Sequence, residues 1–257
     1  MLRAASDAAP AGRALATQTR RVVPDRMPAA FASQERFLAR RARAAQHGAV
    51  PGRAPIQPID PVHPQPRHIA RAIAVLEAGG LVSYPTDTYY AIGCDLFQKR
   101  AIEKMAMLKR RDPKKPFAFL CGDLGEVAKY AIVDNERFRL LRRLLPGPYT
   151  VILPATRVVP RTALTRQRAV GVRVPDAPVA LALVHGLGRP LATTSAAVAD
   201  EEPLVDARDI QDQLGHGLDL ILDGGMKLNE ASTVLDLSGP RPIVLRQGKG
   251  RVEGLLG

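Results

Sequence analysis

Seven short segments combine hydroxyl or cationic side chains with residues that turn the backbone. They are residues 84–88 (YPTDT), 109–111 (KRR), 146–150 (PGPYT), 171–175 (GVRVP), 193–196 (TTSA), 231–234 (ASTV) and 245–248 (LRQG). Arginine binds a carboxylate or a phosphate through paired hydrogen bonds, and lysine acts as a compact point charge. The residue types therefore favour a site for phosphate and carboxylate groups.

Each segment also has a structural explanation when it is taken alone. Thr-Asp-Thr fits a turn in which Asp87 accepts backbone N–H groups. A Lys-Arg-Arg run at a helix end satisfies terminal carbonyls and the helix dipole, and Pro-Gly-Pro ends a helix. The prediction of a site therefore depends on the order and combination of the segments.

Helices and strands that alternate from residue 67 onward must position these segments. The spacing of apolar residues predicts helices over residues 68–78, 99–109, 124–131, 136–145 and 179–187. It predicts strands over residues 81–84, 117–121, 149–153, 169–174, 191–194, 218–222, 233–237 and 243–246. From Pro85 a polar loop is predicted to lead to the second helix. The alternation predicts an α/β protein with one layered domain, in which helices pack on a mixed sheet and strand ends gather at a ligand-binding crevice.

Residues 1–57 differ in composition from the rest and are predicted to be an extension of a domain at residues 58–257. They contain ten arginines, no lysine and three acidic residues, so they carry +7 of the net charge of +12. Residues 1–50 are predicted to be mostly disordered, and six prolines between residues 51 and 66 favour an extended backbone. The Arg-rich start is typical of a mitochondrial transit peptide, and a translation start placed too early, with Met27 as the true one, fits equally well. We expect a cytoplasmic protein, or a mitochondrial one if the extension is a transit peptide.

Composition excludes several classes of protein. No apolar run approaches the roughly 20 residues that span a bilayer, so no membrane segment is expected. Cys94 and Cys121 are isolated and lack CxxC spacing, which argues against a disulfide framework or a zinc site and favours a reducing compartment. No metal ligand is predicted, and no pattern in the sequence indicates an oligomeric state.

The ordered set of segments resembles the YrdC/Sua5 family of threonylcarbamoyl-adenylate synthases over about residues 66–250. Residues 84–93 (YPTDTYYAIG) are similar to the family's opening YPT[DE]TxYGLG. The further matches are Lys109-Arg110-Arg111 to KxR, Lys115-Pro116 to a KP or NP pair, residues 146–150 to PGPxT, 172–175 to VRxP, 232–234 to STV and 246–248 to R-x-G. Seven ordered matches at suitable spacings make the resemblance specific.

Two positions depart from the family pattern. Ser195-Ala196-Ala197 stands where the family has S-x-N, so the amide of the asparagine is absent, and Ala91 stands where a glycine is expected. Together with Gly93-Cys94-Asp95, these departures resemble the YciO branch of the family. The missing asparagine bears on the nucleotide phosphate contacts and on the level of activity.

The resemblance implies a single YrdC-like domain, with a twisted mixed parallel and antiparallel sheet, flanking helices and a basic central cavity. It implies the reaction of L-threonine, bicarbonate and ATP to threonylcarbamoyl-AMP and pyrophosphate, for N6-threonylcarbamoyladenosine in tRNA. ATP would enter with Mg²⁺, and no prosthetic group is implied. The implied roles are catalytic for Lys109 and Arg111, threonine-binding for Thr86 and Thr88, and nucleotide-binding for Thr150, Arg173, Thr194, Ser195, Ser232 and Arg246.

Two alternatives use the same basic cavity. One is a protein that binds tRNA or double-stranded RNA without this activity, in which the Arg-rich extension adds non-specific affinity. The sequence has no aromatic stacking platform or RNP-like motif, which weakens sequence-specific RNA recognition. The other is an enzyme that acts on a different carbamoyl or acyl substrate, an alternative kept open by the missing asparagine.

Overall fold

Ten strands form one sheet across the residues that the computed structural model describes, which are 52–110, 117–159, 164, 167–199, 201–227 and 230–254. The predicted disordered residues 1–50 lie outside these ranges, and so do Arg111, Lys115 and Pro116. The strand order is β1-β8-β2-β3-β7-β4-β6-β5-β9-β10. The strands are β1 (Ile56–Pro58), β2 (Val82–Pro85), β3 (Tyr90–Asp95), β4 (Ala118–Leu120), β5 (Tyr149–Pro154), β6 (Ala169–Arg173), β7 (Leu191–Ser195), β8 (Leu220–Asp223), β9 (Thr233–Asp236) and β10 (Ile243–Arg246).

The sheet is mixed, as predicted. β1 and β2 both pair with β8 in parallel, and β4–β6 and β5–β9 are parallel too. The pairs β2–β3, β3–β7, β4–β7, β5–β6 and β9–β10 are antiparallel. The α/β fold class predicted from the alternation of elements is confirmed.

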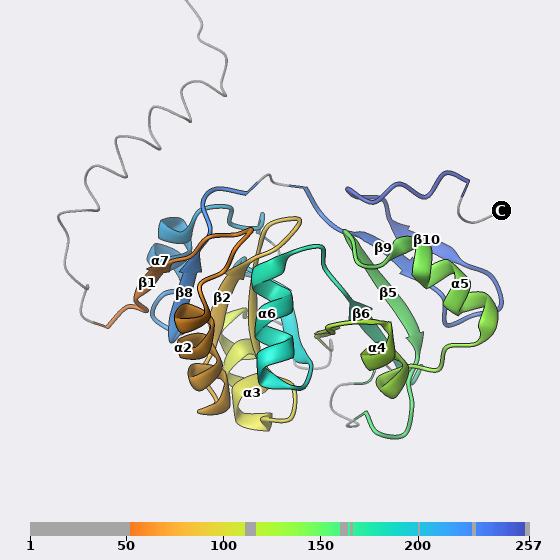
Figure 1. The fold of residues 1–257 in the computed structure, drawn as a ribbon, viewed down its shortest axis with the longest axis horizontal. Helices are drawn as coiled ribbons and strands as arrows, with labels where there is room; N and C mark the ends of the chain where they lie inside the picture. Colours follow the sequence, from red (N-terminus) through yellow and green to blue (C-terminus); the bar gives the residue numbers. More distant parts are fainter. Residues whose placement is uncertain are drawn as a thin grey trace, which may run out of the picture. The chain divides into compact units, whose positions relative to one another are not determined.

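Helices cover both faces of the sheet (Figure 1). They are α2 (Pro66–Glu77), α3 (Lys99–Leu108), α4 (Leu124–Tyr130), α5 (Asn135–Leu144), α6 (Pro178–Leu187) and α7 (Ala207–Leu214). α2 and α6 lie side by side on one face, where Leu76 and Leu183 share a core with Tyr84 of β2. Met105 of α3 and Ile210 of α7 belong to the core of the other face. No helix within the described ranges is long and apolar enough to cross a membrane.

Three elements were not predicted. β3 lies within the predicted polar loop after Pro85, and all six of its residues are buried, so it lacks the alternation that marks a half-exposed strand. α7 has a largely polar sequence, but its Ala207, Ile210 and Leu214 are buried on one side and Asp206 caps its first turn. β1 lies in the proline-rich stretch that was predicted to be extended, and it begins just before the predicted domain boundary.

The strand register alone would keep Arg173 away from the end of β2. Through β4 and β7, Arg173 is in register with Asp95 at the end of β3, whereas Pro85 of β2 lies opposite Tyr90 at its start. Five residues along a flat strand correspond to roughly 16 Å. The contact described below therefore requires a twisted sheet and a loop after β2 that folds back over it.

Candidate functional site

The loop after β2 is fixed by its own threonine hydroxyls. Thr86 donates from Oγ1 to the main-chain carbonyl of Tyr89 at 2.6 Å, and its Oγ1 accepts from the Thr88 N–H at 3.2 Å. The two hydroxyl oxygens are 3.0 Å apart, so with the Thr86 proton committed to Tyr89 the Thr88 hydroxyl donates to Thr86. Both side chains are buried. The hydroxyls predicted to bind threonine therefore already hold the loop in a defined turn.

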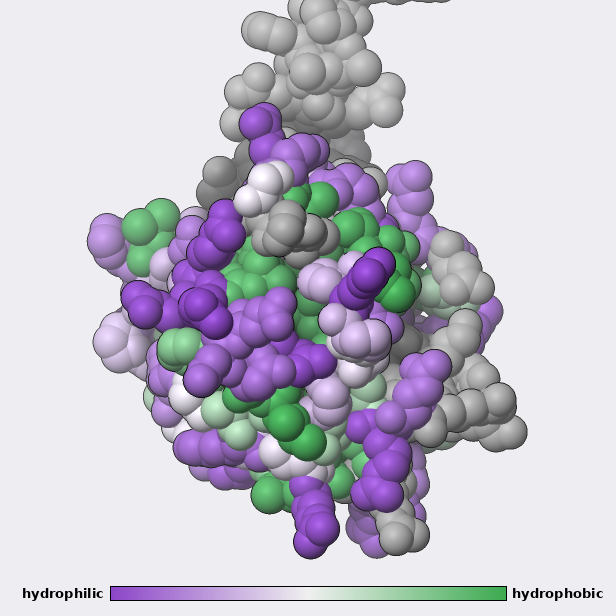
Figure 2. Space-filling view, turned by 90° about the vertical axis from the view of Figure 1, so that its right-hand side faces the viewer, coloured by the Kyte–Doolittle hydropathy of each residue, from purple (hydrophilic) through white to green (hydrophobic). Residues whose placement is uncertain are grey.

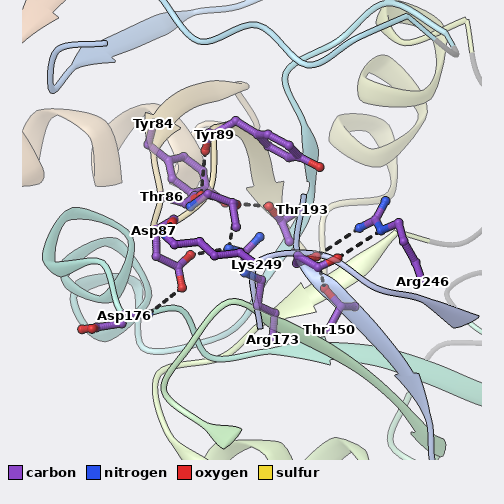
Figure 3. Close-up of polar contacts among 12 residues, drawn as sticks. Tyr84, Thr86, Asp87, Tyr89, Thr150, Arg173, Asp176, Thr193, Arg246 and Lys249 are labelled. Atoms are coloured by element: carbon purple, nitrogen blue, oxygen red, sulfur yellow. Dashed lines mark hydrogen bonds and ion pairs between the residues drawn. The ribbon is translucent and has the colours of Figure 1, made fainter. Parts of the chain in front are cut away.

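Arg173 of β6 forms an ion pair with Asp87 in this loop (Figure 3). The same guanidinium nitrogen donates to the Thr88 hydroxyl at 2.9 Å, and the second Asp87 oxygen accepts from the Asp176 N–H at 3.1 Å. The Arg173 and Asp87 side chains are only 10% and 8% exposed. Arg173, predicted to bind nucleotide, thus lies against the loop predicted to bind threonine.

Two lysines that the sequence analysis did not single out lie near Asp87. The Lys249 ammonium donates to the main-chain carbonyl of Asp87 at 2.7 Å (Figure 3). Lys227 follows β8, and burial lowers its pKa; Asp87 opposes that shift, and the positive charge of Lys249 adds to it. Arg173, Lys227 and Lys249 thus concentrate positive charge around one carboxylate.

A second polar cluster joins β5, β9 and β10. Parallel pairing of β5 with β9 brings Thr150 beside Ser232, and their hydroxyl oxygens are 3.1 Å apart. Arg246 donates from Nε to the Ser232 carbonyl at 3.0 Å and from a terminal nitrogen to the Ser232 hydroxyl at 3.1 Å (Figure 3). Ser232 therefore contacts both Thr150 and Arg246, and all three residues were predicted to bind nucleotide.

The third set lies at the end of β7. Lys109, which is 3% exposed, donates from Nζ to the main-chain carbonyl of Ser195 at 2.7 Å. Thr193 contacts the Tyr84 hydroxyl at 2.7 Å on the sheet face that α2 and α6 cover. Because side chains alternate along a strand, Thr194 points to the opposite face from Thr193 and Ser195. The structure thus joins Lys109 to Ser195 and separates Thr194 from its two neighbours.

Comparison with known proteins assigns this arrangement to a family. The model of the Sua5/YciO/YrdC family, described as "Telomere recombination", matches residues 74–248. The chain belongs to the Sua5/YciO/YrdC family. The resemblance predicted from the motifs is confirmed.

The relatives of this chain include named synthases and proteins without an assigned activity. The uncharacterized protein YciO of Escherichia coli is 39% identical over 200 residues, which cover 77% of this chain and 97% of YciO. The threonylcarbamoyl-AMP synthase of Mus musculus is 35% identical over 176 residues, which cover 66% of this chain and 62% of the mouse protein.

Solved structures of family members share the fold. The crystal structure of E. coli YciO matches with a TM-score of 0.75 at 37% identity, over 79% of this chain and 99% of YciO. P. abyssi Sua5 complexed with L-threonine matches with a TM-score of 0.73 at 28% identity, over 78% of this chain and 59% of Sua5. These matches support the layered α/β architecture described above.

The family motif S-x-N has no amide here. Ala196 and Ala197 are both buried, and the main chain of Ala196 is fixed by hydrogen bonds from its N–H to Tyr90 and from the Leu204 N–H to its carbonyl. The Ala197 methyl group therefore occupies the position from which an asparagine side chain would donate.

The glycine of the family motif R-x-G positions Lys249. Thr233 of β9 donates to the Gly250 carbonyl at 2.6 Å and accepts from the Gly248 N–H at 2.9 Å, and the Lys249 N–H donates to Ala231. A Cβ on Gly248 would lie 2.2 Å from the Ala231 carbonyl oxygen, so only glycine permits this approach. Because Lys249 follows the motif glycine, the sequence offered a reason to consider it as a site residue, whereas no motif in the sequence includes Lys227.

A hollow of about 420 Å³ lies elsewhere, between α5 and the segment around the β9–β10 turn, and none of the predicted site residues lines it. Figure 2 views this side of the molecule, where hydrophilic side chains surround scattered hydrophobic patches. Arg137 on its rim donates to the carbonyls of Leu237 and Gly239 at 2.8 and 3.0 Å. These bonds tie α5 to the turn. The predicted site residues lie outside this hollow, so we place the candidate site around Asp87 and Ser232.

Proposed function

We propose that the chain forms threonylcarbamoyl-AMP from L-threonine, bicarbonate and ATP. The observation that supports this proposal is a pair of polar clusters that the segment after β10 connects. One cluster is Thr86-Asp87-Thr88 with Arg173, and the other is Thr150 with Ser232 and Arg246. Lys249 belongs to the segment after β10 and reaches the first cluster. A relative named threonylcarbamoyl-AMP synthase and the complex of P. abyssi Sua5 with L-threonine support the proposal.

The chemistry needs two anions to meet. The threonine amine and bicarbonate give a carbamate and water, and a carbamate oxygen then attacks the α-phosphorus of ATP. The bond to the β-phosphate breaks, and pyrophosphate leaves. Lys109, Arg111, Arg173 and Arg246 would neutralise the phosphates, which is the main requirement for transfer at phosphorus.

Hydroxyl groups would orient the two substrates. Thr86 and Thr88 would face the threonine side, and Thr150, Ser195 and Ser232 would donate to the nucleotide, whereas Thr194 lies on the opposite face of β7 from Ser195. No histidine lies in any of the matched motifs, so positioning and charge neutralisation would carry the reaction.

Magnesium would enter as part of the ATP complex. In the described part of the chain no group of three or more His, Cys, Asp or Glu residues is arranged to hold a metal ion. A Mg²⁺ that enters with ATP would be bound mainly by phosphate oxygens and water. The product would serve the modification of a tRNA adenosine, which makes tRNA the downstream partner of this proposal.

The test is turnover by the purified full chain with ATP, Mg²⁺, L-threonine and bicarbonate, following pyrophosphate and the adenylate by chromatography. We expect a product that requires threonine and bicarbonate and is lost in Lys109→Ala and Arg111→Ala. Lys129→Ala, which removes one positive charge from an exposed position of α4, is the matched control. A folded chain that binds ATP without forming the adenylate would refute the proposal for these substrates.

The buried Ala197 favours a second candidate, an enzyme with the same site and a different carbamoyl or acyl substrate. Without the amide, the phosphates or the amino acid lose one donor that the family motif supplies. Replacing threonine by other amino acids and by hydroxy acids in the same assay distinguishes the candidates, because only the second gives its best turnover with another substrate.

A further inference from the structure

More positive charge surrounds Asp87 than its carboxylate can balance. Arg173 forms an ion pair with the carboxylate, and Lys249 bonds to the main-chain carbonyl of the same residue. Lys227 follows β8, and the charges of Asp87 and Lys249 both act on its pKa. Asp176, the other acidic residue at this loop, contributes its N–H, and its side chain is exposed. Three cations and one buried anion leave a net charge of +2.

Arg173 has a hydrogen-bonding group without a partner. One terminal nitrogen serves both Asp87 and Thr88, whereas the Nε atom is buried and has no partner among the described residues. An unpaired buried donor on a charged group is costly. The guanidinium can therefore gain from an anion that shares it with Asp87.

Lys227 is held by its main chain and not by its side chain. Its N–H donates to the Val205 carbonyl at 3.0 Å. Within the described ranges, its ammonium has no hydrogen-bond or ion-pair partner, although it is half-buried. Burial and the Lys249 charge lower its pKa and the Asp87 charge raises it, so a further anion nearby would stabilise the charged form.

We propose that Arg173, Lys227 and Lys249 form a subsite for a small dianion beside the hydroxyls of Thr86 and Thr88. Only the identity of the ligand rests on the proposed function, in which two molecules carry paired anionic groups. One is N-carboxylated threonine, which has two carboxylates, and the other is pyrophosphate. Free threonine is a zwitterion without net charge, so the subsite would favour the carbamate over the free amino acid.

The test uses stable probes without ATP or threonine. Calorimetric titration of the full chain compares succinate, pyrophosphate and acetate at constant ionic strength. We expect one of the dianions to bind at least about tenfold more tightly than acetate, and Lys227→Ala and Lys249→Ala each to lower its affinity by about tenfold or more. Lys129→Ala should leave the affinity unchanged. Preference for succinate assigns the subsite to the carboxylated amino acid, and preference for pyrophosphate assigns it to the phosphates.

Equal binding of acetate and both dianions by the wild-type chain would overturn the proposal, and so would unchanged affinity in both lysine variants. The wild-type comparison holds even if a variant does not fold, and Lys249→Arg and Lys227→Arg, which keep the charge, serve as the second pair of variants. Because no nucleotide is present, a chain that binds a dianion without forming the adenylate refutes only the proposed reaction. A chain that forms the adenylate without dianion preference refutes only the subsite.

Discussion

The Lys249 ammonium lies 2.7 Å from the main-chain carbonyl oxygen of Asp87, although 162 positions separate the two residues in the sequence. Lys249 follows the last strand at one end of the sheet, and Asp87 follows a strand near the other end. This bond therefore connects the two halves of the candidate site. Any change that displaces the segment after β10 should also disturb the loop after β2.

The Asp87–Arg173 ion pair should contribute strongly to stability because both side chains are buried. Asp87→Asn leaves the guanidinium unpaired, and Arg173→Gln leaves the carboxylate unpaired, so each should lower the free energy of unfolding by about 3–5 kcal/mol. The double variant should lose at least about 1 kcal/mol less than the sum of the two losses. Urea denaturation of the four proteins measures this coupling, and additive losses would show that the two side chains do not interact.

Asp87→Asn should also strengthen dianion binding, in contrast to its effect on stability. The carboxylate competes with a bound anion for Arg173 and lowers the net positive charge around it. We expect the affinity for the preferred dianion to rise severalfold, measured by the same calorimetric titration. A weaker affinity in a variant that remains folded would mean that Asp87 assists the ligand instead of competing with it.

Gly248→Ala tests the position of Lys249. The added methyl group would lie 2.2 Å from the Ala231 carbonyl oxygen, and overpacking of this kind costs about 1–3 kcal/mol. The variant should unfold at a lower urea concentration and should bind the dianion less tightly. Gly239→Ala is the matched control, because a Cβ at Gly239 meets no atom within 4 Å. Equal effects of the two substitutions would argue against a specific clash at Gly248.

The two cysteines should be protected in the folded chain. Burial, followed by the charge of Asp95, raises the pKa of Cys94 from 9.0 to about 12, and burial also raises the pKa of Cys121. At pH 8 the Cys94 thiolate should be on the order of 1,000-fold scarcer than for an exposed thiol. A disulfide reagent should label both thiols in urea and label them very slowly without it. Rapid labelling of the native chain would reveal frequent opening of the sheet.

Stability should fall at alkaline pH because two buried tyrosines resist ionisation. Burial raises the pKa of Tyr84 and Tyr90 above the ordinary value of 10.0. Below pH 10 the tyrosines are protonated in both the folded and the unfolded chain, and their contribution to stability is complete. Above pH 10 only the unfolded chain releases these protons. Each group should therefore lower the free energy of unfolding by up to about 1.4 kcal/mol per pH unit. Urea unfolding between pH 8 and 11 measures how the free energy of unfolding declines with pH, and this decline should be shallower in Tyr84→Phe than in the wild-type chain. If the slope is unchanged in both Tyr84→Phe and Tyr90→Phe, this account is wrong.

Five of the six described helices and most strands could be predicted because their apolar residues repeat with the expected spacing, whereas α7 (Ala207–Leu214) has a largely polar sequence. β3 could not, since Tyr90–Asp95 is buried on both sides and follows a proline and a polar turn. The family motifs indicated the members of the second cluster, because hydroxyl and arginine residues stand at fixed positions in them. Asp87 was interpreted as a turn residue, since its partner Arg173 is remote in the sequence and the register gives no hint of contact. Lys227 could not be predicted as a site residue, because it lies in no motif and the charges that act on it, Asp87 and Lys249, are remote from it in the sequence.

The strand order has a consequence for the synthesis of the chain. β2 and β3 form a hairpin of adjacent strands, but their outer neighbours are β8 and β7, and the bond from the Leu81 N–H to Asp219 spans 138 residues. The two outer edges of the hairpin can therefore pair with β8 and β7 only after most of the domain has left the ribosome. Such long-range pairing folds slowly and leaves strand edges exposed to other chains. Recovery of the refolded protein should consequently decrease as its concentration increases.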